Sequence, residues 1–114
     1  MPDRDDNSDH HGDVVVEDVE ERSRYQISVD GRTAGHAAYL DRGGRRIFVH
    51  TEIAEEFGGR GLGSRLVAYA MDDVAARELA IVPLCPFVAA WLEDHPERTD
   101  VDVDTDRLEA LTRR

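Results

Sequence analysis

One stretch of the chain combines four glycines with the start of an amphipathic helix: Phe57-Gly58-Gly59-Arg60-Gly61-Leu62-Gly63-Ser64-Arg65-Leu66. A strand-like segment, residues 46–53, precedes it, and apolar residues at near-helical spacing follow it. Glycines between a strand and a helix let the main chain approach a ligand, and the N–H groups and dipole of the helix favour a phosphate there. The stretch therefore predicts a phosphate-binding loop or, alternatively, a glycine-rich turn without a ligand.

Two common phosphate-binding loops do not fit this stretch. A Walker loop ends in Gly-Lys-Ser/Thr, and the chain contains no lysine. A Rossmann fingerprint that begins at Gly61 and Gly63 requires a third glycine at the position of Leu66. The stretch instead resembles the coenzyme A loop of the GCN5-related N-acetyltransferase (GNAT) superfamily, Arg/Gln-x-x-Gly-x-Gly/Ala. Gly58 stands where that pattern has Arg or Gln, and Arg60 is a candidate replacement for the missing cation.

Other motifs follow in the order found in one compact branch of this superfamily, the YjdJ type. Its members have a His-Thr-Glu-Val strand, an Arg-Gly-x-Gly-x-Gly/Ala loop, a Pro-x-Cys segment and an aromatic-x-x-x-His-Pro-Glu ending. The similar segments here are His50-Thr51-Glu52-Ile53, Val82-Pro83-Leu84-Cys85-Pro86-Phe87-Val88 and Trp91-Leu92-Glu93-Asp94-His95-Pro96-Glu97. The resemblance covers roughly residues 24 to 98. Several ordered motifs are more specific than any one of them.

The resemblance implies a fold and an activity. The fold is a compact α/β fold, with a mixed, mostly antiparallel sheet, a crossover helix after the third main strand and a second helix near the C-terminus. The activity is direct transfer of an acetyl group from acetyl-CoA to an amine of a small molecule or a protein. The alternative is a module that binds CoA or acetyl-CoA with little or no catalysis and has a regulatory or interaction role. Because the chain is short for this superfamily, we expect an acceptor site that is open or is completed by a partner chain in a homodimer.

The resemblance also assigns residues to the acetyl donor. The phosphates are assigned to the loop, mainly through main-chain N–H groups, and the pantetheine arm to the strand before it. The loop residues are Gly59, Arg60, Gly61, Leu62, Gly63 and Ser64. Glu52 and Ile53 are assigned to the arm through their main-chain groups.

Three side chains are candidates for the chemistry. Glu52, at the end of the third strand, is a candidate general base or a surface carboxylate near Glu55 and Glu56. His50 lies on the same face of that strand and is a proton relay or a structural histidine. Cys85 precedes a helix that starts at a proline, and a helix N-terminus favours a reactive thiol. Cys85 is therefore a candidate contact for the thioester sulfur or a candidate nucleophile, and the alternative is a buried hydrophobic residue. We expect Trp91 in the core and His95 at a helix C-terminus.

Periodicity predicts the elements around these residues. Alternating apolar residues predict an antiparallel meander of three strands. The short apolar run at 80–83 predicts a fourth strand, which the crossover helix makes parallel to the third. The expected meander strands are 24–29, 33–40 and 46–53, joined by turns at Asp30-Gly31 and Asp41-Arg42-Gly43-Gly44, and the helices are 61–78 and one from Pro86 to before Pro96.

The two ends are less regular. We expect 1–13 to be a disordered acidic tail, 14–98 the acetyltransferase-like domain, and 99–114 an acidic segment with a linker and a short helix capped by Thr105. The apolar run 14–16 is a strand start or a docking arm. His10-His11, beside Asp9 and Asp13, is part of a solvated tail or, alternatively, binds a metal, and we expect the solvated tail and no metal site.

Charge and cysteine content limit the classes of partner. The net charge of −11 lies in the ends: −7 in residues 1–22 and −4 in 93–114, around a neutral centre. This distribution argues against nucleic-acid binding, which needs a basic face. No apolar run approaches the roughly 20 residues of a membrane span, and the first residues do not form a signal-peptide core. With one cysteine, an internal disulfide is impossible, and we expect a cytoplasmic protein.

Overall fold

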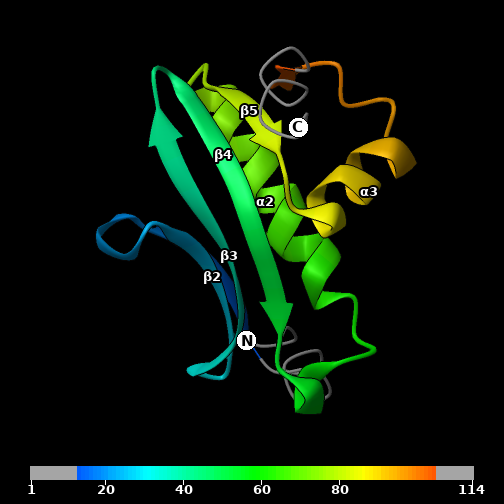
Figure 1. Ribbon diagram of the computed structural model, residues 1–114. Coiled ribbons are helices and arrows are strands. Elements are labelled where there is room, and N and C mark those ends of the chain that lie inside the picture. Colours follow the sequence, from blue (N-terminus) through cyan, green and yellow to red (C-terminus); the bar gives the residue numbers. More distant parts are fainter. Residues whose placement is uncertain (1–12, 105–114) are drawn as a thin grey trace, which may run out of the picture.

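The computed structural model describes residues 13–104, which form one mixed β-sheet with two α-helices on one of its faces (Figure 1). The elements in chain order are β1 (Val14–Val19), the 3₁₀ turn η1 (Glu20–Arg22), β2 (Arg24–Val29), β3 (Arg32–Arg42), β4 (Arg45–Ile53), the 3₁₀ turn η2 (Glu55–Phe57), α2 (Leu62–Ala76), β5 (Ala80–Pro83), α3 (Pro86–Asp94) and β6 (Asp102–Val103). The strand order follows the chain from β1 to β6. Strands β1 to β4 pair antiparallel, and β4, β5 and β6 pair parallel. This is the predicted α/β fold with its mostly antiparallel sheet and crossover helix.

Two tight turns set the register of the meander. Asp30 and Gly31, at φ 51° and 81°, link β2 to β3, and Gly43 and Gly44, at φ 58° and 78°, link β3 to β4. Positive φ at both central residues is the signature of a hairpin turn whose twist matches that of the strands. The turn at Asp30-Gly31 was predicted from the sequence.

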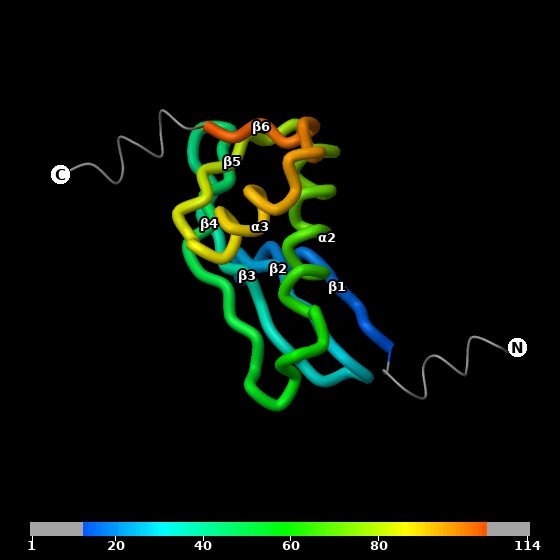
Figure 2. Tube along the Cα trace, turned by 90° about the vertical axis from the view of Figure 1, so that its right-hand side faces the viewer, coloured from blue at the N-terminus to red at the C-terminus, as the bar shows by residue number. Residues whose placement is uncertain are grey.

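The hydrophobic core lies between the sheet and both helices, which cover the same face (Figure 2). Helix α2 connects β4 to its parallel neighbour β5, and α3 connects β5 to its parallel neighbour β6, so both connections move in the same direction along the sheet. Because such connections are almost always right-handed, both helices lie on the same face. Alternate strand residues such as Tyr25, Ile27 and Phe48 meet Leu66 and Met71 of α2 there. Within residues 13–104, no helix covers the opposite face, which we call the open face.

A β-bulge in β4 decides which side chains reach the open face. Tyr39 pairs with Phe48, but its neighbour Ala38 pairs with His50, so one extra residue lies in β4 at this point. Phe48 is buried against the helices, whereas His50 and Glu52 are exposed beyond the bulge. The bulge therefore shifts the alternation of side chains by one residue, so that His50 and Glu52 point to the open face.

Three details differ from the expectations. Residues 102 and 103, expected in a linker, form β6 beside β5. The long helix is shorter than 61–78, because Arg77 caps α2 and Glu78 adopts the left-handed conformation at φ 58°. The apolar run at 14–16 belongs to β1. The predicted tail, the His10-His11 pair and the helix capped by Thr105 fall outside the described residues, and the domain boundaries stay predictions.

Candidate active site

Strands β4 and β5 are neighbours over only part of their length. Their pairing runs from Arg45 opposite Ala80 to Phe48 opposite Pro83. The Cys85 N–H then donates to the Phe48 carbonyl at 2.9 Å, and the chain turns away into α3. Strand β4 continues to Ile53, so its last part extends past the end of β5 (Figure 1). Within residues 13–104, no strand pairs with this part of β4 on the β5 side, which leaves a main-chain edge for an extended ligand.

The glycine loop between η2 and α2 ends at an uncapped helix. Gly59 and Gly61 have φ of 78° and 73°, values that L-residues with side chains rarely adopt. Gly61 is the N-cap of α2, and no side chain caps this end. The N–H groups of the first turn have no acceptor within the helix, and they carry the positive end of its dipole. This geometry is compatible with an anion, and the assignment of the loop to a phosphate stays a prediction.

Two arginines add positive charge to this end of α2. The Arg60 guanidinium lies 5.4 Å from the centre of the Phe57 ring, and Phe57 is buried. Arg65, which the sequence analysis did not select, is exposed in the first turn of α2, where there is no acidic residue. Among the residues that the structure describes, neither guanidinium forms an ion pair with a carboxylate. A cation at a helix N-terminus is unfavourable because it opposes the helix dipole. Its unusual position in the first turn of the predicted helix is the feature of the sequence that could have identified Arg65 as a site residue.

Gly63 and Ser64 also have packing roles. A Cβ atom at Gly63 would lie 2.6 Å from Cζ of Phe87 in α3. The Trp91 indole N–H donates to Oγ of Ser64 at 3.0 Å. Both contacts join the start of α2 to α3, so these two residues hold the helices together as well as lining the predicted phosphate loop.

The predicted roles of Trp91 and His95 are confirmed. Trp91 is buried, and His95 is the C-cap residue of α3. The two rings stack with centroids 3.9 Å apart, and Nδ1 of His95 lies 2.7 Å from the Trp91 carbonyl oxygen. The contacts explain the aromatic-x-x-x-His spacing as one helical turn that closes the end of α3.

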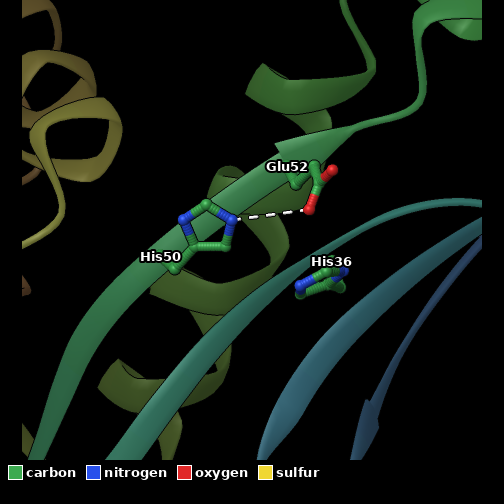
Figure 3. Close-up of side chains that lie close together, drawn as sticks. All are labelled: His36, His50 and Glu52. Atoms are coloured by element: carbon green, nitrogen blue, oxygen red, sulfur yellow. Dashed lines mark hydrogen bonds and ion pairs between the residues drawn. The ribbon is translucent and has the colours of Figure 1, made fainter.

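Glu52 and His50 meet a third side chain on the open face (Figure 3). Nε2 of His50 lies 3.4 Å from Oε1 of Glu52, and both side chains are more than half exposed, 60% and 64%. His36 projects from β3, where it pairs with Glu52 across the strands, and its ring centroid is 5.9 Å from that of His50. Glu52 and His36 also border a shallow hollow of ≈ 220 Å³ between the ends of β3 and β4. His36 was not predicted as a site residue, because its proximity to Glu52 depends on the register between β3 and β4.

His36 titrates differently from an isolated histidine. Its partial burial, together with the nearby positive charge of Arg24, lowers the pKa of the imidazole below 6.5. Glu52 acts in the opposite direction but does not outweigh them. The neutral ring is therefore favoured near neutral pH.

Cys85 lies on the other side of the sheet from Glu52 and His50. It is 3% exposed within the hydrophobic core, and its Sγ is 3.3 Å from Oγ1 of Thr51. Thr51 lies between His50 and Glu52 in β4, so its side chain points to the helix face. The structure therefore brings His50 and Glu52 together and separates them from Cys85, which sits where β4 and β5 diverge.

Comparison with known proteins shows the family. The model of the GCN5-related N-acetyltransferase family matches residues 24–101, and the chain belongs to this family. The solution structure of a GCN5-like candidate N-acetyltransferase from Staphylococcus aureus is similar, with a TM-score of 0.61. The similarity covers 78% of this chain and 87% of that one at 22% sequence identity, so it bears on the fold alone. The comparison with curated proteins gives no match.

Within residues 13–104, no helix is long and apolar enough to cross a membrane.

Proposed function

We propose that this protein transfers an acetyl group from acetyl-CoA directly to an amine. The observation that carries the proposal is the divergence of β4 from β5 beside an uncapped helix N-terminus. The unpaired edge of β4, where the main-chain groups of Ile53 face away from β3, suits hydrogen bonds to the amides of a pantetheine arm, whereas the main chain of Glu52 faces His36 in β3. The loop from Gly59 to Ser64 suits the pyrophosphate, with Arg60 as its counter-charge. These features support a donor site along one continuous path.

Acetyl transfer needs a base for the acceptor and a group near the leaving sulfur. The amine nitrogen bonds to the thioester carbonyl carbon, the carbon–sulfur bond breaks, and the amine loses a proton. We assign Glu52 as the proton acceptor and His50, 3.4 Å away, as the group that relays the proton to solvent. We assign the contact with the sulfur to the Thr51 and Cys85 side chains, which meet where the two strands part. The burial of Cys85 in the core supports direct transfer rather than an acetylated cysteine.

The open face supports an accessible acceptor site. The hollow of ≈ 220 Å³ beside Glu52 is smaller than the roughly 300–1,000 Å³ of most small-molecule pockets. It suits the amine-bearing end of an acceptor whose remainder stays outside, such as a protein side chain or terminus or an extended small molecule. A second chain could complete this site in a homodimer. With a single cysteine and a CoA substrate, we place the protein in the cytoplasm.

Ligand-dependent stability tests the donor site. CoA and acetyl-CoA should raise the melting temperature, because they bind the folded protein, whereas ATP and NAD should do so much less. Gly61→Val places a β-branched residue at φ 73°, where the main chain should meet phosphate, and should weaken CoA binding by about tenfold or more, roughly 1.4 kcal/mol. Equal stabilisation by NAD, or no stabilisation by CoA, would contradict the proposal.

Acetylation of a broad amine panel, with hydrolysis of acetyl-CoA subtracted, tests the activity. Transfer to at least one amine class supports the enzyme. CoA binding without transfer to any amine would favour a CoA-binding module with a regulatory or interaction role, which the exposure of Glu52 and the small hollow leave as the alternative.

A further inference from the structure

The cluster on the open face contains three potential metal ligands from two strands. One ligand atom each from His36, His50 and Glu52 lies within 4.8 Å of the other two. These atoms come from β3 and β4, whose pairing places His36 directly opposite Glu52 (Figure 3). Two imidazoles and one carboxylate form a ligand set that suits a borderline transition metal and occurs in zinc sites.

We propose that His36, His50 and Glu52 bind a divalent transition metal ion of the zinc class on the open face of the sheet. No metal site was expected from the sequence, in which His36 and His50 lie in different predicted strands and form no short metal-binding motif. The inference does not depend on acetyl transfer, and a bound ion would occupy the Glu52 carboxylate and the His50 imidazole, so it would inhibit their proposed roles as base and relay.

The distances suit a tetrahedral ion. With metal–nitrogen and metal–oxygen bonds of about 2.0–2.1 Å, neighbouring ligand atoms in a tetrahedral site lie about 3.3 Å apart. Nε2 of His50 and Oε1 of Glu52 are already 3.4 Å apart. The three ligand atoms lie within 4.8 Å of one another, so the His36 nitrogen has to move by at most about 1.5 Å toward the other two, which a side-chain rotation supplies. Three protein ligands leave one position for water.

The charges around the cluster make a second, independent test possible. Glu52 supplies the negative charge, and Arg24, which precedes Tyr25 on β2, faces the open side and acts electrostatically on His36. Its Nε is buried without a hydrogen-bond partner among the described residues. Arg24 does not coordinate the ion but repels it, so removing its charge should strengthen metal binding.

Zinc titration calorimetry on the full chain tests the site, in a His10→Gln/His11→Gln background that removes the two consecutive histidines of the N-terminal sequence as competing ligands. We expect one zinc ion per chain, and at least tenfold weaker binding after His36→Gln, His50→Gln or Glu52→Gln. Glu55→Gln removes a neighbouring exposed carboxylate and should leave the affinity unchanged. Arg24→Gln should raise the affinity several-fold, and Mg²⁺, which prefers oxygen ligands, should not compete.

Zinc-induced changes in melting temperature provide a readout that also reports on folding. A variant that melts like the parent without zinc, but loses the zinc-induced increase, supports the assignment. Unchanged zinc affinity in the His36 and His50 variants would overturn it, as would an equal loss in Glu55→Gln. Acetyl-CoA is absent from both measurements, so a failure of this site and a failure of the proposed transferase activity can be told apart.

Discussion

Glu52 and Cys85 are candidates for different chemical steps, and they lie on opposite faces of the sheet. Glu52 is exposed beside His50, whereas Cys85 is buried against Thr51. An amine that approaches from the open face meets Glu52 without crossing the sheet. The proposed mechanism therefore predicts unequal effects of substituting the two residues.

Glu52→Gln removes the proton acceptor but keeps the shape of the side chain. Turnover should fall by on the order of 10²-fold, while CoA affinity changes little. Steady-state kinetics and calorimetry measure both, with Glu55→Gln as the matched control. Cys85→Ser should cost much less. Intact-mass spectrometry after incubation with acetyl-CoA alone tests the covalent alternative. An acetyl adduct that requires Cys85 would favour a covalent mechanism over direct transfer.

His36 should make stability depend on pH. Burial and Arg24 lower its pKa in the folded state below 6.5, so the unfolded chain binds this proton more readily than the folded chain. The contribution of neutral His36 is present above pH 6.5 and is lost as the pH falls through the lowered pKa. Urea unfolding on either side of pH 6.5 should show a smaller change in the free energy of unfolding for His36→Gln than for the parent. An identical pH profile in the variant would contradict the assignment.

At the scale of elements, the start of α2 serves both the ligand loop and the packing of α3. A Cβ at Gly63 would require the exposed Phe87 ring to move, whereas a Cβ at Gly61 would meet nothing within 4 Å. Gly61 is instead constrained by its φ of 73°. The two positions therefore favour glycine for different physical reasons within this one loop.

Alanine substitutions distinguish these reasons. Gly63→Ala should lower the free energy of unfolding, and the loss should shrink when Phe87→Ala is combined with it, with a coupling of about 0.5–3 kcal/mol. Gly61→Ala should cost about 1 kcal/mol through its backbone conformation, with no rescue by Phe87→Ala. Urea denaturation of the single and double variants measures the coupling of Phe87 to Gly63 and to Gly61. Additive effects of Gly63→Ala and Phe87→Ala would show that α3 tolerates the methyl group.

The elements themselves were largely predictable from the sequence, because their signals are local. Alternation gave β2, and Asp30-Gly31 gave its hairpin turn. Strand β6 was missed because two residues carry no usable period and pair with β5 only after α3 intervenes. The grouping of His36 with Glu52 was missed for the same reason, since it depends on pairing between strands and on the bulge in β4.

At the scale of the whole molecule, the buried Arg46 joins several elements on the helix face. Its guanidinium contacts Asp41 of β3 at 2.8 Å and the Tyr25 hydroxyl of β2 at 2.7 Å, and it lies 3.4 Å from Asp18 of β1. The Tyr25 hydroxyl in turn donates to Asp73 of α2 at 2.7 Å. One side chain, 4% exposed, thus connects the first strand of the sheet to its main helix.

Arg46→Met keeps much of the volume but leaves the partly buried carboxylates without this cation. The free energy of unfolding should fall by on the order of 3 kcal/mol, because breaking a buried ion pair leaves an uncompensated charge. Urea denaturation measures the loss, and Arg42→Met, at an exposed arginine of β3, serves as the control. Equal losses in the two variants would mean that the buried network contributes no more than a surface charge.

The two outer strands of the sheet come from the acidic ends of the chain. Strand β1 lies within residues 1–22, which carry a net charge of −7, and β6 within 93–114, which carry −4. Unpaired strand edges invite other sheets to pair with them, and like charges oppose that approach. The acidity thus guards against aggregation at the places where the fold is most exposed to it. This protection should weaken near the sequence pI of ≈ 4.7, where the repulsion between molecules disappears.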